Sequence, residues 1–347
     1  MKAAIYNQND KLIIKEIPQP SLTSLNGGDG AIIKVHGCGL CGSDIVKLKQ
    51  NLVPSGTVLG HEVVGEIVEL KSSTDKFKVG DHVVLGHHVP CYHCVYCKAG
   101  NYSMCREFKQ TNIIPGGFSE YIYVSQAHLD HTVAKIPDSL SDIDAAFMEP
   151  AACCLRAVRR ADVKPNEHVL IIGLGSIGLL LGQIAKHFGA VVCGCDLLDE
   201  RLDIARRHGF DSAIRYQDNE HTSDFYKSLI SSDFSGRVGA DKIFLASGSG
   251  ASLPFALACI RDGGVISVFS SIKSYSAGFP NNDIYYRELT VMGSYSPSPA
   301  DLHDSLKLLQ TGIIKVEDYT TEYRLDEINT AIEDTLSNRI LKAFIRI

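Results

Sequence analysis

The sequence has little of what marks a secreted, membrane or nucleic-acid-binding protein. Its 347 residues carry a net charge of -6, so they offer no basic surface for phosphates and we expect no nucleic-acid partner. The first twenty residues lack the apolar core of about 7 to 15 residues that a signal peptide needs. The most apolar stretch, 169–182, is shorter than the roughly 18 residues that span a bilayer. We therefore expect a cytoplasmic protein with no membrane partner.

The sequence also has no disulfide framework, internal repeat or low-complexity segment. Its eleven cysteines are an odd number in a long chain, which favours free thiols and metal ligands over the paired cysteines of a small secreted domain. Apolar residues make up 45% and charged residues 21% of the chain, as in folded globular proteins. The length predicts two domains, and small molecules are the expected partners.

The pattern of apolar residues changes near residue 153. From about 30 to 125, short β-rich runs such as AIIKV, EVVGEIVEL and SEYIYV are separated by Gly, Pro and Asp, which indicates a mostly β domain. From HVLII onward, apolar strand runs alternate with helical periods, which predicts βαβ units and a parallel sheet. A helix near 300–310 and a final strand, LKAFIRI, would complete the first domain.

Four cysteines lie within fifteen residues, in the segment CYHCVYCKAGNYSMC. The two-residue gaps allow the thiolates of Cys91, Cys94, Cys97 and Cys105 to converge on one tetrahedral ion. An iron–sulfur cluster is the rival interpretation, but the last gap of seven residues and the following Arg106 differ from the ferredoxin pattern. With four thiolates the ion has no open position, so we expect a structural zinc.

A dinucleotide fingerprint follows the strand HVLII. Its residues in GLGSIG are Gly173, Gly175, Ser176, Ile177 and Gly178, and a long apolar helix follows, the context that pyrophosphate binding requires. The strand AVVCGC ends at Asp196, where a carboxylate binds both ribose hydroxyls and repels a 2'-phosphate. The pattern therefore favours NAD over NADP. Arg201 is nearby, and we expect it at the exposed start of the next helix.

The order of short motifs along the chain resembles the zinc-dependent medium-chain dehydrogenases. The motifs are GLCGSD, LGHEVVGEIVE, VGDHVV, the four-cysteine loop, GGFSEY, MEP and GLGSIG, and they cover nearly the whole chain. Within the family, the chain is most similar to the sorbitol and galactitol-1-phosphate (polyol) dehydrogenases. The resemblance implies an α/β protein with a GroES-like, mostly β catalytic domain carrying both zinc sites at 1–153 and 295–347. A doubly wound Rossmann NAD-binding domain would occupy 154–294.

The resemblance also implies the residues of a second, catalytic zinc site. Cys41 and His61 would bind the metal, and the third ligand would be Glu149, of the Glu149-Pro150 pair, or its competitor Glu62, with the two glutamates able to exchange during turnover. Ser43 would take part in moving the substrate proton. Relatives often continue this relay through a histidine five residues after the cysteine ligand, where this chain has Val46. The histidines without a motif, and the two cysteines of an apolar helical run, are expected to be structural: His36, His82, His87, His88, Cys153 and Cys154.

By resemblance, the activity is hydride transfer between a secondary alcohol and NAD, with two zinc ions per chain. The expected substrate is a polyol, a polyol phosphate or a related sugar-derived alcohol or ketone, and relatives form homodimers or homotetramers. Lys47 follows the catalytic cysteine where the galactitol-phosphate branch has a basic residue, so it is a candidate contact for an anionic end group. Three alternatives stay open: an NADPH-dependent reductase of the same architecture, a non-catalytic metal-binding module and an iron–sulfur protein.

Overall fold

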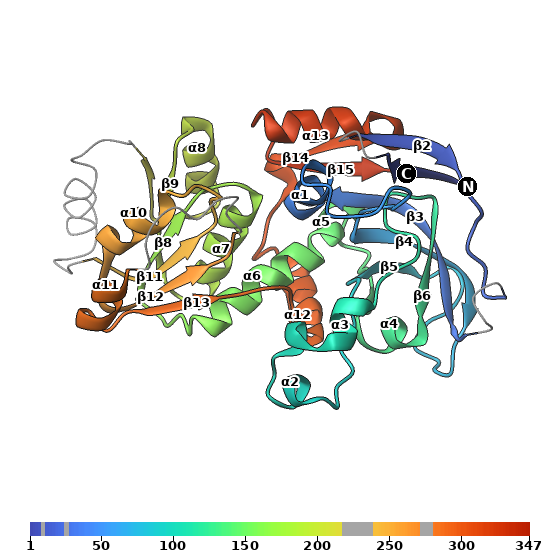
Figure 1. Ribbon diagram of the computed structural model, residues 1–347, viewed down its shortest axis with the longest axis horizontal. Helices are drawn as coiled ribbons and strands as arrows, with labels where there is room; N and C mark the ends of the chain where they lie inside the picture. Colours follow the sequence, from blue (N-terminus) through green and yellow to red (C-terminus); the bar gives the residue numbers. More distant parts are fainter. Residues whose placement is uncertain (8–10, 24–27, 217–238, 271–279) are drawn as a thin grey trace. The chain divides into compact units, whose positions relative to one another are not determined.

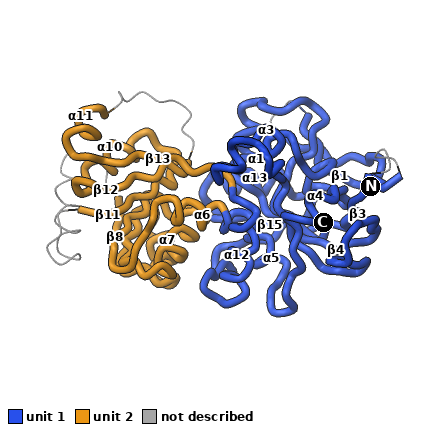
Figure 2. The backbone as a smooth tube through the Cα atoms, turned by 90° about the horizontal axis from the view of Figure 1, so that it is seen from below, with its two compact units in different colours: residues 1–152, 297–347 blue, residues 153–296 orange. Residues whose placement is uncertain are grey.

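A computed structural model describes residues 1–7, 11–23, 28–216, 239–270 and 280–347. The chain divides into two compact units, of which the first is discontinuous in sequence: Met1–Ala152 with Pro297–Ile347 form unit 1, and Cys153–Ser296 form unit 2. Figure 2 shows the two units in different colours. No helix among the described residues has both the length and the apolar character needed to cross a membrane.

Unit 1 is built on a mainly antiparallel sheet and a separate hairpin. The sheet order is β14-β15-β3-β4-β5-β7, with β6 also paired to β3, and β1 pairs with β2. Strand β14 runs parallel to β15, so the C-terminal segment completes the sheet that the N-terminal half begins. The strands are β1 (Lys2–Tyr6), β2 (Leu12–Glu16), β3 (Gly30–Leu40), β4 (Glu62–Lys71), β5 (His82–Leu85), β6 (Tyr121–Ser125), β7 (Val133–Lys135), β14 (Thr320–Arg324) and β15 (Lys342–Arg346).

Short helices surround this sheet, and aromatic and aliphatic side chains from distant segments form its core. Tyr6, Phe118 and Phe344 are almost fully buried, although they come from both ends and the middle of the chain. The helices that begin in unit 1 are α1 (Gly42–Lys49), α2 (Val95–Lys98), η1 (Tyr102–Met104), α3 (Arg106–Gln110), α4 (Gln126–His131), α5 (Asp142–Ala146), α6 (Met148–Arg160), α12 (Pro299–Gln310), η2 (Glu317–Tyr319), η3 (Leu325–Glu327) and α13 (Ile328–Leu336).

Unit 2 contains a six-stranded, entirely parallel sheet in the order β10-β9-β8-β11-β12-β13 (Figure 1). The first strand, β8, lies in the middle, and the chain adds strands outward on both sides of it, which defines a doubly wound α/β sheet. Its elements are β8 (His168–Ile172), α7 (Ser176–His187), β9 (Val191–Asp196), α8 (Asp199–Arg207), β10 (Ser212–Arg215), β11 (Ala240–Leu245), α10 (Ser252–Cys259), β12 (Ile260–Val268), α11 (Asn281–Tyr286) and β13 (Thr290–Gly293).

The strands and helices of unit 2 follow from their residue patterns. Every residue of β8 is buried, as expected for a central parallel strand with helices packed on the sheet. Helix α7 contacts β8 and β9, and its small Gly182 makes close packing possible, because a Cβ there would lie 1.9 Å from the ring of Phe210. The expected α/β fold, with a mostly β domain and a Rossmann domain, is confirmed.

Candidate catalytic and structural metal sites and cofactor site

Cys41 is held at the beginning of helix α1, immediately after the buried strand β3. It is the N-cap residue: its Sγ accepts a hydrogen bond from Ser43 N, and its own N–H donates to Asp44 Oδ2 at 3.3 Å. Ser43 Oγ lies 3.3 Å from Cys41 Sγ, and the Ser43 side chain is exposed. The dipole of α1 favours negative charge at this end, so the position suits a thiolate ligand.

His61 lies beside Cys41 in the buried interior of unit 1. Its Nδ1 is 3.3 Å from Asp44 Oδ1, and only 7% of His61 and none of Asp44 is exposed. Burial alone would lower the pKa of His61, but the Asp44 carboxylate and the Cys41 sulfur outweigh burial and raise this pKa well above its usual value. A carboxylate that holds one ring nitrogen orients the other for a metal, so Asp44 is a positioning residue that motif reasoning left without a role.

Glu62 is the third member of this cluster. One ligand atom from each of Cys41, His61 and Glu62 can be chosen so that all three lie within 4.8 Å of one another. Glu62 Oε2 forms an ion pair with Lys342 Nζ at 2.5 Å, and both residues are buried. Glu62 Oε1 has no hydrogen-bond partner in the described part of the chain. A buried carboxylate oxygen without a partner, next to a thiol and an imidazole, fits a zinc ligand set.

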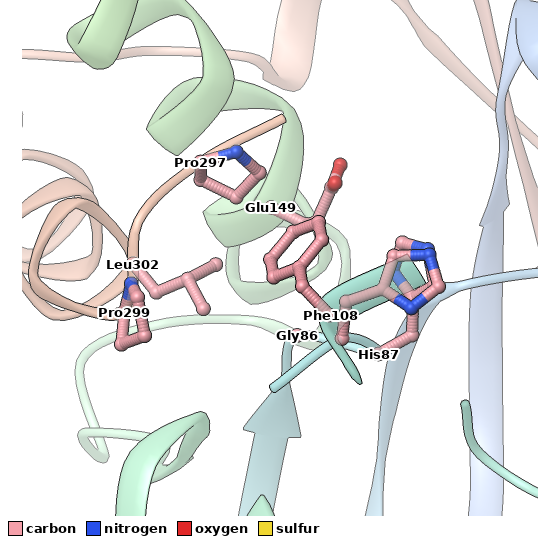
Figure 3. Close-up of a pocket in the computed structure, with 8 residues that line it drawn as sticks. Gly86, His87, Phe108, Glu149, Pro297, Pro299 and Leu302 are labelled. Carbon is pink, nitrogen blue, oxygen red and sulfur yellow. The ribbon is translucent and has the colours of Figure 1, made fainter. Parts of the chain in front are cut away.

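Glu149, the alternative ligand, lies outside that three-residue group. It is the second residue of α6, is 6% exposed and lines a small pocket of unit 1 together with His87, Phe108 and Leu302 (Figure 3). The His87 ring also contacts the His61 ring in a tilted arrangement, with ring centroids 4.6 Å apart. Among the described residues, the structure therefore brings Glu62 into the group with Cys41 and His61, and it places Glu149 on a pocket whose histidine contacts His61.

The four cysteines of the loop converge on one point. Cys91, Cys94, Cys97 and Cys105 each offer a sulfur, all within 4.8 Å of one another. The Sγ–Sγ distances are 3.6 Å for Cys94–Cys97 and 3.9 Å for Cys91–Cys97, close to the edge of about 3.8 Å expected for tetrahedral zinc with Zn–S bonds of about 2.3 Å. Burial would raise the pKa of Cys105, but backbone N–H groups of Cys91 and Phe108 lower it. These sulfurs fit a closed zinc site.

The glycine-rich turn between β8 and α7 forms an open cradle. Gly173 has a φ of +95°, which favours glycine, and a Cβ on Gly178 would lie 1.9 Å from Gly173 O. A Cβ on Gly175 would meet no atom within 4 Å, so the backbone there is open to a ligand. Gly175 is the N-cap of α7 and provides no side-chain cap, which leaves the N–H groups of Ser176 and Ile177 in the first turn of the helix available for a pyrophosphate.

Asp196 lies at the end of β9, as expected, but its carboxylate is already engaged. Oδ2 accepts a hydrogen bond from Leu174 N at 2.7 Å, and Oδ1 accepts from Leu197 N at 2.8 Å. Arg201 is not the exposed residue that the sequence suggested: it is the third residue of α8, its side chain is 19% exposed, and its Nη1 lies 3.4 Å from Asp196 Oδ2. The carboxylate attracts the guanidinium back toward the turn, which explains the difference.

Comparison with known proteins identifies the family. Residues 27–138 match the model of the "Alcohol dehydrogenase GroES-like domain", and residues 176–311 match that of the "Zinc-binding dehydrogenase". The chain is 30% identical to a sorbitol dehydrogenase of Bacillus subtilis over 99% of this chain and 97% of the relative. The chain therefore belongs to the zinc-type alcohol dehydrogenases, in the medium-chain class and its polyol branch. Members of this family are oxidoreductases that act on CH–OH groups.

Two solved structures extend the likeness. Galactitol-1-phosphate dehydrogenase from Escherichia coli matches with a TM-score of 0.87 and 25% identity, over 100% of both chains. A putative zinc-binding dehydrogenase from Sinorhizobium meliloti 1021, bound to NADP, matches with a TM-score of 0.86 and 25% identity, over 100% of this chain and 99% of that chain. The expected family and enzyme class are confirmed.

Proposed function

We propose that the chain is a zinc-dependent dehydrogenase that transfers a hydride between a secondary alcohol of a polyol, a polyol phosphate or a related sugar-derived substrate and NAD. The observation that carries the proposal is the convergence in unit 1 of the half-buried Cys41 with the buried His61 and Glu62. When bound, zinc supplies a Lewis acid that acidifies a hydroxyl group, and NAD supplies a hydride acceptor. The likeness to sorbitol and galactitol-1-phosphate dehydrogenases supports the polyol class.

In this proposal, 1–153 and 295–347 form the catalytic domain with both zinc sites, and 154–294 form the NAD-binding domain. Cys41, His61 and Glu62 hold the catalytic zinc, with Glu149 on the adjoining pocket as the alternative ligand. Cys91, Cys94, Cys97 and Cys105 hold the structural zinc, giving two zinc ions per chain.

Side chains of the protein orient the proposed zinc ligands and carry the proton of the substrate hydroxyl group. Asp44 fixes the ring of His61, and Lys342 balances the buried charge of Glu62. Ser43 Oγ, exposed beside Cys41 Sγ, would relay the substrate hydroxyl proton by accepting it while passing its own hydroxyl proton on, and the reverse reaction would run the same relay backwards. Val46 stands where relatives continue the relay with a histidine, so the proton leaves Ser43 to solvent by another route in this chain.

NAD is the proposed cofactor because the negatively charged Asp196 carboxylate lies against the glycine-rich turn, where it accepts a hydrogen bond from Leu174 N. Of the donors to this carboxylate, Arg201 is the most distant at 3.4 Å, so it is the contact that a ribose hydroxyl would replace. A 2'-phosphate would meet the carboxylate and be repelled. Arg201 is also the residue that would hold a 2'-phosphate if it swung away from Asp196, which makes NADP the specific alternative.

We also propose that the enzyme works in the cytoplasm as a homodimer or homotetramer, with small-molecule alcohols and ketones as its partners. None of the eleven cysteines forms a disulfide bond, which is usual in the reducing interior of a cell. The oligomeric state is proposed by analogy with the family, whose members are usually dimers or tetramers.

Lys47 supports an anionic end group on the substrate. It lies in the last turn of α1, is half-buried and forms no ion pair within the described part of the chain. Its positive charge lies close to the proposed catalytic site, because it helps to lower the pKa values of Asp44 and His87, which both contact His61. Lys49, two residues further, is exposed and provides a matched control on the same helix.

The test compares Lys47→Ala and Lys49→Ala with a polyol phosphate and with the same polyol without phosphate. We expect Lys47→Ala to raise KM for the phosphorylated substrate about tenfold and to leave KM for the uncharged polyol within about twofold, because only the former loses a charge contact. Lys49→Ala should resemble the wild type. Equal effects of Lys47→Ala on both substrates would overturn the phosphate contact.

A further inference from the structure

Two histidines and an aspartate that belong to neither zinc site gather in unit 1. His36 lies on β3, His82 begins β5, and Asp142 begins α5. The β3–β4 register passes from Val35↔Gly65 to Gly37↔Val64, so His36 is the extra residue of a β-bulge. Bulges redirect a side chain that regular pairing would place elsewhere. Both histidines are expected from the sequence to be structural, because neither belongs to a metal-ligand motif.

The ligand atoms of this group have the spacing of a metal site. His36 Nδ1 lies 3.2 Å from His82 Nε2, and His82 Nε2 lies 2.8 Å from Asp142 Oδ1. Ligand atoms of all three residues lie within 4.8 Å of one another. Two imidazole nitrogens bound to one tetrahedral zinc at about 2.0 Å are about 3.3 Å apart, so the pair needs almost no movement to share an ion.

When both imidazoles are neutral, a single proton can link the ligand atoms of His36, His82 and Asp142. If His82 Nε2 carries its proton, it donates to Asp142, and the lone pair of His36 Nδ1 is left facing the same N–H. If His36 Nδ1 donates to His82 Nε2, the lone pair of His82 faces the carboxylate instead. A cation bound by all three atoms would take the place of this shared proton, because each atom has a lone pair to direct to it.

The charged groups around His36, His82 and Asp142 are compatible with cation binding of moderate affinity. Arg346 Nη1 lies 2.9 Å from the other oxygen of Asp142 and orients the carboxylate, while Glu322 Oε2 balances Arg346 at 2.6 Å. Burial lowers the pKa of His36 in spite of Asp142 and Glu66, so its imidazole is neutral near pH 7 and able to bind a metal. The site is half-buried, which leaves room for water in the remaining coordination positions.

We propose that His36, His82 and Asp142 form a third metal site, for a divalent transition metal of the zinc class. Two imidazoles and one carboxylate are a ligand set that zinc accepts, with solvent completing the coordination. The nearby Arg346 makes binding weaker than at the four-cysteine site. A bound ion would cross-link β3, β5 and α5, and through Arg346 it would reach β15, the strand that also carries Lys342.

The test titrates the purified, zinc-containing enzyme with ZnCl₂ and measures both zinc bound per chain and Tm. The wild type should bind one equivalent more than His82→Gln and His36→Gln, and added zinc should raise its Tm more than theirs. Asp142→Asn should weaken uptake of this equivalent at least tenfold. Because the comparison counts a difference between variants, it does not depend on how many ions the other sites hold.

The control is His187→Gln, which removes an exposed histidine at the end of α7 and should leave zinc uptake equal to that of the wild type. Each variant's Tm without added zinc shows whether it folds, and Asp142→Asn keeps both imidazoles should a histidine variant fail to fold. Equal zinc uptake by the wild type and all three site variants would overturn the proposal. So would an equal loss in His187→Gln, because that would indicate adventitious binding to surface histidines.

Discussion

Gly39 and Glu62 stand opposite each other on β3 and β4, and the Glu62 carboxylate occupies the space that a side chain on residue 39 would need. A Cβ on Gly39 would lie 1.9 Å from Glu62 Oε2. The carboxylate is held there by Lys342, whose ammonium group lies 2.5 Å away. A glycine on one strand and a lysine on another thus fix where the third member of the catalytic cluster lies.

The first prediction concerns this glycine. Gly39→Ala should displace Glu62 from Lys342 and lower kcat by at least about tenfold, since about 1.4 kcal/mol of lost transition-state stabilisation corresponds to that factor. Gly293→Ala is the control, because a Cβ there meets no atom within 4 Å. Steady-state kinetics and the free energy of unfolding of both variants are the measurements. Unchanged kcat in Gly39→Ala would show that the position of Glu62 does not matter.

The second prediction separates the two zinc sites. Cys94→Ala breaks the closed four-cysteine site, so it should lose one zinc and lower Tm. Cys41→Ala should lose the other zinc and all turnover while the protein stays folded, because its site is proposed to be catalytic. Elemental analysis of the wild type should give two zinc per chain. Iron instead of zinc, or equal unfolding of both variants, would refute this division of roles.

The third prediction is a loss of stability in acid that originates at His88. Burial, with nearby positive charges, lowers the pKa of His88 to about 4, although its hydrogen bond to Thr111 O opposes this. The unfolded chain therefore binds this proton more readily than the folded protein, with a pKa near 6.5. The free energy of unfolding should fall as pH drops from about 6.5 to about 4, by on the order of 3 kcal/mol, and should not change for this reason above that window.

To test this prediction, the free energies of unfolding of the wild type and His88→Gln are measured by denaturant titration across that pH range. Release of zinc in acid affects both proteins, so the difference between their profiles isolates the histidine. The variant should lose less stability than the wild type as pH falls. Superimposable profiles would contradict the assignment.

The fourth prediction concerns the cofactor. NAD should exceed NADP in kcat/KM by at least about tenfold, or about 1.4 kcal/mol, because the Asp196 carboxylate repels a 2'-phosphate. Asp196→Ala should reduce this ratio mainly by weakening NAD. Asp199→Ala, three residues further and paired with the exposed Arg215, is the control and should keep the wild-type ratio. A wild-type preference for NADP would refute the choice.

Much of the fold and part of the site follow from short-range sequence patterns. The four-cysteine loop and GLGSIG are local, so their spacing alone places their ligand atoms together. Gly39 and Lys342 could not be predicted, because their contact with Glu62 depends on the pairing of β3 with β4 and with β15. His36 on β3 and His82 on β5 meet through a bulge and through the pairing of both strands with β4, which no short-range pattern encodes. Arg201 was misplaced because the attraction of Asp196 is not part of a helix pattern.

With zinc bound by Cys41, His61 and Glu62, the protein should catalyse the oxidation of a polyol by NAD. The most direct measurement is the rate of NADH formation when the zinc-containing enzyme meets a panel of polyols and polyol phosphates with NAD, beside Cys41→Ser under the same conditions. The wild type should turn over at least one member of the panel, and Cys41→Ser should turn over none. Absence of turnover on every polyol and polyol phosphate, or equal rates in the two proteins, would contradict it.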